Sequence, residues 1–234
     1  MDQDRAVNVG LSREAISERS FLSQVYLWMA MGLAMTGLVA GWMALTPSVV
    51  VALMRNSFLL IVLLLAQLGI VFWLSSRIMS LTLTGATIGF GIYATLNGVL
   101  FSSLFLVYTG ASIASTFIVT AGTFGAVSLY GFTTKRDLSS VGSFCFMALV
   151  GMILASLVNW LLKSPALYWI ITYAGIAIFI GLTAYDTQRL KAIHEQGFNS
   201  ADTMKKAALV GALKLYLDFI NLFLLLLRVM GRRK

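Results

Sequence analysis

The sequence has few charged residues, one cysteine, one histidine and two prolines among its 234 residues. Only 11% of the residues are charged, whereas a soluble domain carries about 25%. Too little polar surface is left to cover a water-exposed globule, because 59% of the residues are hydrophobic and the mean hydropathy is +0.89. The composition therefore predicts a membrane protein that crosses the bilayer several times.

The single cysteine and the single histidine exclude several kinds of site. Cys145 has no second cysteine with which to form a disulfide or a thiolate metal site within one chain. His194 is expected in a polar loop, so no histidine is left within the membrane for an intramembrane serine–histidine or histidine-rich zinc catalyst. The sequence therefore predicts that the protein is not an enzyme and holds no tightly bound cofactor.

The net charge of +8 invites a nucleic-acid interpretation, but the basic residues lie at the ends of apolar runs, where they set membrane topology. We therefore predict no nucleic-acid partner and take the lipid bilayer as the surrounding medium. The acidic-leaning start of the chain, followed by a long apolar run, is not typical of a cleavable secretory peptide.

Seven apolar runs are compared with the roughly 20 residues that a helix needs to cross the hydrocarbon core. They are residues 24–45, 57–74, 81–107, 111–132, 141–162, 166–190 and 207–230. The longest polar connection between them is Lys191–Lys206, which leaves no room for a soluble domain. We expect an all-α membrane protein with a cytoplasmic N-terminal segment (1–23), one seven-helix domain (24–230) and a basic tail (231–234).

Basic residues indicate the orientation of the chain. With the N-terminus in the cytoplasm, most of the Lys and Arg residues that precede the last run lie on the cytoplasmic side, which predicts a multi-pass inner-membrane protein. The C-terminal Arg228, Arg232, Arg233 and Lys234 break this rule if the seventh run crosses completely. Two alternatives remain open: the last helix crosses despite its charges, or it is re-entrant and shielded from lipid.

Ionisable residues in two of the apolar runs mark the candidate site. Gly181-Leu-Thr-Ala-Tyr-Asp186-Thr-Gln-Arg-Leu190 places a carboxylate at the end of the sixth run. In the last run, six residues, most of them polar, recur at alternating spacings of three and four, which places them on one helix face. They are Gly211, Lys214, Asp218, Asn221, Leu225 and Arg228. Such a stripe is expected to face neighbouring helices or water, so Asp186 and Asp218 are the predicted centre.

Two carboxylates that are close together in a low dielectric cannot both stay charged easily, so one tends to hold a proton. The pair could respond to pH, or could hold a hard cation such as Ca²⁺ weakly through its oxygen atoms. Arg77, just past the second run, and Lys214, four residues before Asp218, are the candidate charge partners. The alternative is that Lys and Arg merely neutralise the two acids and stabilise the bundle.

The chain resembles the Bax-inhibitor family, and within it the bacterial inner-membrane members. The resemblance is carried by the motif around Asp186, by Leu215-Tyr-Leu-Asp218-Phe-Ile-Asn221-Leu-Phe and by Tyr130-Gly-Phe-Thr-Thr-Lys-Arg-Asp137-Leu. It implies seven helices with the last one central, and a di-aspartyl pH sensor at Asp186 and Asp218 in a Ca²⁺ leak channel. It also implies an arginine partner near the end of the second helix, which Arg77 matches. Gln67 stands where relatives often have an acidic residue, which removes one candidate cation ligand.

The leading hypothesis is thus a pH-sensitive Ca²⁺ leak pathway in which Asp186 and Asp218 form the gate and a weak ion site. A second hypothesis is a non-transporting regulator that uses residues 1–23 to bind a membrane partner, with a membrane-bound AAA protease as the candidate that the resemblance suggests. A distant third is an intramembrane hydrolase in which the two carboxylates mimic an aspartyl protease dyad.

Overall fold

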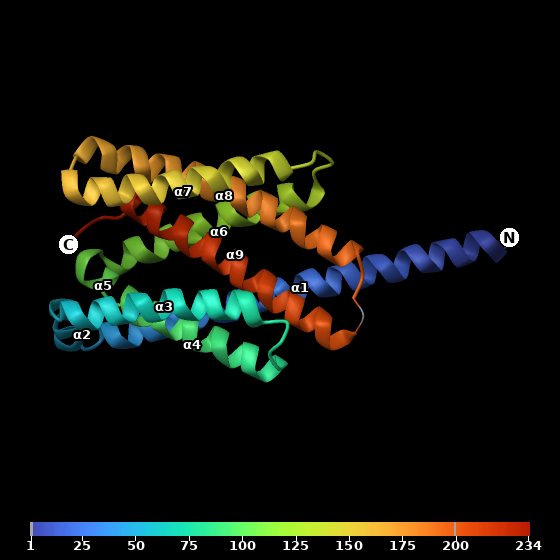
Figure 1. Ribbon diagram of the computed structural model, residues 1–234, viewed down its shortest axis with the longest axis horizontal. Helices are drawn as coiled ribbons and strands as arrows, with labels where there is room; N and C mark the ends of the chain where they lie inside the picture. The colour runs from blue at the N-terminus through green and yellow to red at the C-terminus, as the bar shows by residue number, and fades with distance from the viewer. Residues whose placement is uncertain (1, 199) are drawn as a thin grey trace.

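The computed structural model describes residues 2–198 and 200–234, and describes side chains from Ser20 onward (Figure 1). The predicted N-terminal segment, residues 1–23, and the partner hypothesis that depends on it therefore lie mostly outside the described side chains. Helices make up nearly all of the described chain. They are α1 (Asp2–Ala44), α2 (Pro47–Arg55), α3 (Ser57–Arg77), α4 (Leu83–Phe101), α5 (Leu104–Val107), α6 (Gly110–Thr133), α7 (Ser139–Leu162), α8 (Pro165–Glu195) and α9 (Ala201–Met230).

Within the described residues, seven stretches are long and apolar enough to cross a membrane, and they match the seven predicted runs to within a few residues. The predicted all-α membrane fold is confirmed. Two local features were not predicted. The third run is one membrane-crossing stretch, as expected, but a turn at Ser102 and Ser103 divides it into α4 and α5. The polar connection Lys191–Lys206 is mostly helical, because α8 continues to Glu195 and α9 begins at Ala201.

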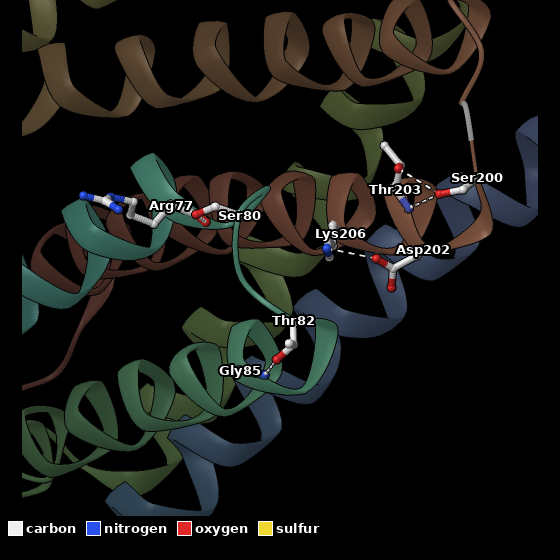
Figure 2. A network of polar contacts seen from close by, with 8 residues as sticks. All are labelled: Arg77, Ser80, Thr82, Gly85, Ser200, Asp202, Thr203 and Lys206. Carbon is white, nitrogen blue, oxygen red and sulfur yellow. Dashed lines mark hydrogen bonds and ion pairs between the residues drawn. The ribbon is translucent and has the colours of Figure 1, made fainter.

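Helix starts at one end of the bundle are stabilised by hydroxyl side chains that accept hydrogen bonds from free backbone N–H groups. Ser200 accepts from the backbone N–H of Thr203 at 3.2 Å, and Thr82 accepts from that of Gly85 at 3.1 Å (Figure 2). Asp202, in the first turn of α9, forms an ion pair with Lys206 at 2.9 Å. Its negative charge also suits the positive end of the helix dipole.

Helix α9 occupies the centre of the bundle. It runs obliquely between the pair α7–α8 and the group α1–α3–α4, with α6 also against it (Figure 1). Of its most apolar stretch 67% of the residues are buried, against 6% for α3. The implied central position of the last helix agrees with the structure.

The C-terminal tail shows that α9 crosses the whole bundle. The helix is continuous from Ala201 to Met230, and the two chain ends lie at opposite ends of the bundle (Figure 1). Beyond it, Arg233 pairs with Tyr108 in an antiparallel β-bridge, and the backbone N–H of Lys234 donates to the carbonyl of Val107 at 2.9 Å. Of the two alternatives left open by the sequence, a continuous helix of this length favours complete crossing over re-entry.

Glycines allow neighbouring helices to approach closely. A Cβ atom at Gly131 of α6 would overlap the carbonyl oxygen of Ala184 in α8, and one at Gly98 of α4 would lie 2.8 Å from the carbonyl oxygen of Thr36 in α1. Backbone atoms cannot rotate away as a flexible side chain can. These two positions therefore hold α6 against α8 and α4 against α1.

We expect Gly131→Ala to destabilise the protein by about 1–3 kcal/mol, because the added methyl group forces α6 and α8 apart. The measurement is the midpoint of sodium dodecyl sulfate-induced unfolding in mixed micelles. Gly122→Ala is the matched control on the same helix, since nothing lies within 4 Å of a Cβ atom there. An equal response of the two variants would contradict the close approach.

Candidate functional site

The polar stripe of α9 lies along α8 in a constant antiparallel register. A Cβ atom at Gly211 would lie 2.5 Å from Leu190, and Lys214 contacts Asp186. Further along, Leu225 lies against Gly175, and Arg228 donates a hydrogen bond to the hydroxyl of Thr172 at 3.4 Å. The predicted common face is therefore the face that α9 presents to α8.

This register determines how the two acids are related. Because Lys214 lies opposite Asp186 and Leu225 lies opposite Gly175, Asp218 falls opposite Leu182, one turn deeper in the bundle than Asp186. The four residues from 182 to 186 correspond to about 6 Å along the helix axis. The structure thus brings the two carboxylates into the same region from different helices.

Lys214 pairs with Asp186 rather than with Asp218. Its Nζ lies 3.7 Å from Oδ1 of Asp186, and no ion pair joins it to Asp218 among the described residues. The Lys214 side chain is 41% exposed and that of Asp186 is 14% exposed. The sequence allowed Lys214 to pair with Asp218, four residues further along the same helix, but the observed pair joins α9 to α8 instead. At 3.7 Å the Lys214 ammonium is held only loosely.

Asp218 is the least satisfied polar group of the site. Its residue is 6% exposed, and its Oδ2 atom is buried with no hydrogen-bond partner among the described residues. A buried carboxylate that lacks a partner is energetically unfavourable, because water solvates it far better than the protein interior does.

Both acids line one cavity of about 760 Å³ between α7, α8 and α9. Tyr185 and Arg189 of α8 and Asn221 of α9 add polar groups to its wall. Apart from Ser143, the α7 side of the wall is apolar, and it reaches the surface of the bundle because Phe146 and Met147 are largely exposed.

Towards the C-terminal end of the bundle the cavity is bounded by apolar side chains. A separate buried cluster fills the space between α7, α8 and α9; its members are Cys145, Ile178, Phe179, Leu182, Leu222 and Leu225. Beyond this cluster Arg228 donates to Thr172, and its guanidinium lies 4.9 Å from the ring centroid of Tyr168. Apolar side chains therefore separate the cavity from the C-terminal end of the bundle.

A buried network that the sequence did not predict holds the opposite side of α9. The Tyr216 hydroxyl lies 2.7 Å from Oγ1 of Thr36, which in turn lies 2.9 Å from the carbonyl oxygens of Gly32 and Ala94. These contacts tie α9 to α1 and α4. The only sequence signal is a phenol and a hydroxyl within apolar runs, and such groups usually find a partner when buried.

Other predicted residues lie apart from the acids. Arg77 is exposed and forms no ion pair with either aspartate among the described residues; in Figure 2 its guanidinium points away from Asp202 and Lys206. His194 is not in a polar loop but in the last turn of α8, where its ring packs against Phe21 and Phe198 at centroid distances of 5.6 and 6.0 Å.

The fold and the site together define a polytopic helical membrane protein with a carboxylate-lined cavity beside its central helix. The chain belongs to the family described as Inhibitor of apoptosis-promoting Bax1, which matches residues 18–234. It is 53% identical to the inner membrane protein YbhL of Escherichia coli K12 over 218 residues, covering 92% of this chain and 93% of the relative. An uncharacterised protein of Borreliella burgdorferi is 39% identical over 222 residues, covering 95% and 96%. The uncharacterised protein RP147 of Rickettsia prowazekii is 42% identical over 216 residues, covering 92% and 91%.

We expect Asp218→Asn to stabilise the protein, because the change removes a buried carboxylate that has no hydrogen-bond partner for one oxygen. The expected gain is about 1–3 kcal/mol, the usual penalty of an unsatisfied buried polar group. The measurement is again the unfolding midpoint in mixed micelles. Asp202→Asn is the control, since its side chain is 59% exposed and its pair with Lys206 should contribute little. A loss of stability in Asp218→Asn would show that the carboxylate is well satisfied.

Proposed function

We propose that the protein is a pH-sensitive cation (Ca²⁺) leak pathway of the bacterial inner membrane, with Asp186 and Asp218 as its gate and ion site. One observation carries this proposal: the buried Oδ2 of Asp218 has no hydrogen-bond partner in the part of the chain that the structure describes, and Asp218 lines the same cavity as a second carboxylate. An ionisable group that is kept inside a membrane protein at a cost in stability is a functional candidate.

The chemistry of the cavity suits a hard cation held weakly. Carboxylate and amide carbonyl oxygens are the ligands that Ca²⁺ prefers, and it takes about 6–8 of them. Asn221 donates its amide N–H to the carbonyl of Leu217 at 2.8 Å, so its carbonyl oxygen is the group left to serve a cation in the cavity. With only two acids, water must supply the remaining ligands. Such a site lets an ion leave again, as conduction requires.

The same oxygens make the proposed pathway sensitive to pH. A carboxylate must be deprotonated to bind a metal ion, so protons and Ca²⁺ compete for Asp186 and Asp218. Cation binding is therefore expected to weaken as the pH falls. The loosely held ammonium of Lys214 competes with Ca²⁺ and protons for Asp186, because it already forms an ion pair with that carboxylate.

The apolar cluster beyond the cavity gives the pathway a closed state. Passage of an ion requires the α7–α8–α9 contacts around Leu222 and Leu225 to open. In this proposal the apolar cluster closes the pathway between the cavity and the C-terminal end of the bundle.

Two observations support the proposed location and orientation. The relative from E. coli is named an inner membrane protein. Basic side chains gather at the end of the bundle where α8 meets α9, which favours the cytoplasm for that end. They are Arg77, Lys135, Arg136, Arg189, Lys191, Lys205 and Lys206.

We expect the double variant Asp186→Asn/Asp218→Asn to lose most Ca²⁺ flux and all of its pH dependence between pH 6 and pH 8, because both carboxylates are then neutral. The measurement uses proteoliposomes loaded with a Ca²⁺-sensitive dye, with Asp202→Asn as the control. Unchanged flux with an unchanged pH profile in the double variant would refute the proposed role of the two acids.

We expect Lys214→Met to strengthen Ca²⁺ binding roughly tenfold, because removing one nearby positive charge contributes on the order of 1.4 kcal/mol. Binding is measured by isothermal titration of the purified protein with Ca²⁺ at pH 7.5. Lys206→Met is the matched control, since its ion pair with Asp202 lies outside the cavity (Figure 2). If both lysine variants bind alike, Lys214 does not compete with the cation.

A further inference from the structure

A second cavity, of about 510 Å³, adjoins the carboxylate-lined cavity at the end of the bundle where α6 meets α7. Tyr185 and Arg189 line both cavities, so the two cavities adjoin at these side chains. We call the second cavity the basic pocket; its further walls are formed by Lys135, Arg136, Asp137, Ser139 and Gln188.

The basic pocket has an excess of positive charge. Lys135, Arg136 and Arg189 face it with one carboxylate, that of Asp137. Hydrogen bonds from the hydroxyl and the backbone N–H of Ser139 hold the pKa of Asp137 below its usual value, so this group stays ionised at neutral pH. Since Asp137 is engaged by Ser139 and no ion pair neutralises Lys135 or Arg136 among the described residues, the cations are available to an anion.

The loop that carries two of these cations is held in place. The side-chain carbonyl of Gln188 accepts from the backbone N–H of Leu138 at 2.8 Å, and its amide donates to the carbonyl of Arg136, also at 2.8 Å. One α8 side chain thus clamps both sides of Asp137. A clamped loop has less entropy to lose when a ligand binds, so the pocket is pre-organised.

The adjoining cavity offers an apolar groove along α7. From the shared residues Tyr185 and Arg189 it continues past Phe146 and Met147 to Ile153, in the middle of α7. These three side chains are largely exposed, so the groove opens sideways towards the hydrocarbon of the membrane. The acids of the site lie on the α8 and α9 walls, and the α7 wall carries no charged residue.

We propose that the basic pocket and the α7 groove together bind one anionic phospholipid from the leaflet at this end of the bundle. The phosphate lies among Lys135, Arg136 and Arg189, and one acyl chain follows the α7 wall past Phe146 and Met147. Basic pockets between membrane helices commonly bind anionic headgroups. The basic pocket is polar and the groove next to it is apolar, just as the headgroup of a phospholipid is polar and the acyl chain next to it is apolar.

The test is native mass spectrometry of the full-length protein in a neutral maltoside detergent. The protein is titrated with phosphatidylglycerol and with phosphatidylcholine of the same acyl chains. We expect preferential binding of phosphatidylglycerol, and about 25-fold weaker binding in Lys135→Gln/Arg136→Gln, since each charge contributes about fivefold. Phosphatidylcholine binding should not change.

Arg55→Gln/Lys163→Gln is the matched control, because both residues are exposed cations at the opposite end of the bundle. Equal weakening in this variant would show that the preference reflects overall charge, and would overturn the proposal. The absence of any preference for phosphatidylglycerol in the unmodified protein would do the same.

A second variant tests the groove. Ser143 is exposed on the α7 wall, so Ser143→Trp is expected to fill the groove and weaken phosphatidylglycerol binding several-fold while leaving the basic pocket intact. Glycerol phosphate, which has no acyl chain, is the probe for the headgroup alone. If glycerol phosphate binds as tightly as the lipid, the site accepts a soluble phosphate and the lipid proposal fails. If Ser143→Trp binds the lipid normally, the acyl chain does not use the groove and the proposal fails as well.

Discussion

The antiparallel contact between α8 and α9 is the constraint on which the site depends. Small residues at Gly211 and Gly175 let Leu190 and Leu225 interlock across the two helices, which determines how far one helix is shifted along the other. Once that register is set, Lys214 must meet Asp186, and Asp218 must lie one turn deeper. A change of register by a single turn would separate the acids or expose one of them to lipid, where a charge is costly.

Other contacts hold α9 from its remaining sides and prevent such a shift. Tyr216 is hydrogen bonded to Thr36 of α1, and Phe219 packs against Phe117 and Phe124 of α6 at centroid distances of 5.3 and 5.5 Å. These groups leave Asp218 no room to rotate towards water on the far side of the helix. The packing of the whole bundle thus keeps the Asp218 carboxylate buried without full hydrogen bonding. Natural proteins keep such incompletely satisfied buried groups chiefly where function requires them.

The sequence predicted the parts of this structure that depend on composition and periodicity. Long apolar runs define the membrane helices, and the spacing of Lys214, Asp218 and Asn221 defines the stripe of α9. The sequence did not predict the contacts between helices. Whether Lys214 pairs with Asp186 or with Asp218 depends on the register of α8 against α9, which no single segment encodes. The interruption after α4 was missed because Ser102 and Ser103 bond back to nearby carbonyls at 2.6 and 2.7 Å, which makes a break possible without any change in hydropathy.

The basic C-terminal tail can now be reconciled with a last helix that crosses completely. The ammonium of Lys234 donates to the carbonyl of Phe105 at 2.6 Å, the backbone N–H of Arg232 donates to Ser112 at 2.8 Å, and Arg228 is directed inward to Thr172. Two of the four cations are therefore bound to the protein through their side chains, and the tail itself is part of the folded structure. The rule that places positive charge in the cytoplasm concerns connecting loops during insertion, and it weighs most heavily on segments next to the early helices. A short tail that follows the last helix and docks on the connection between α5 and α6 is consistent with that rule, because it is not a connecting loop.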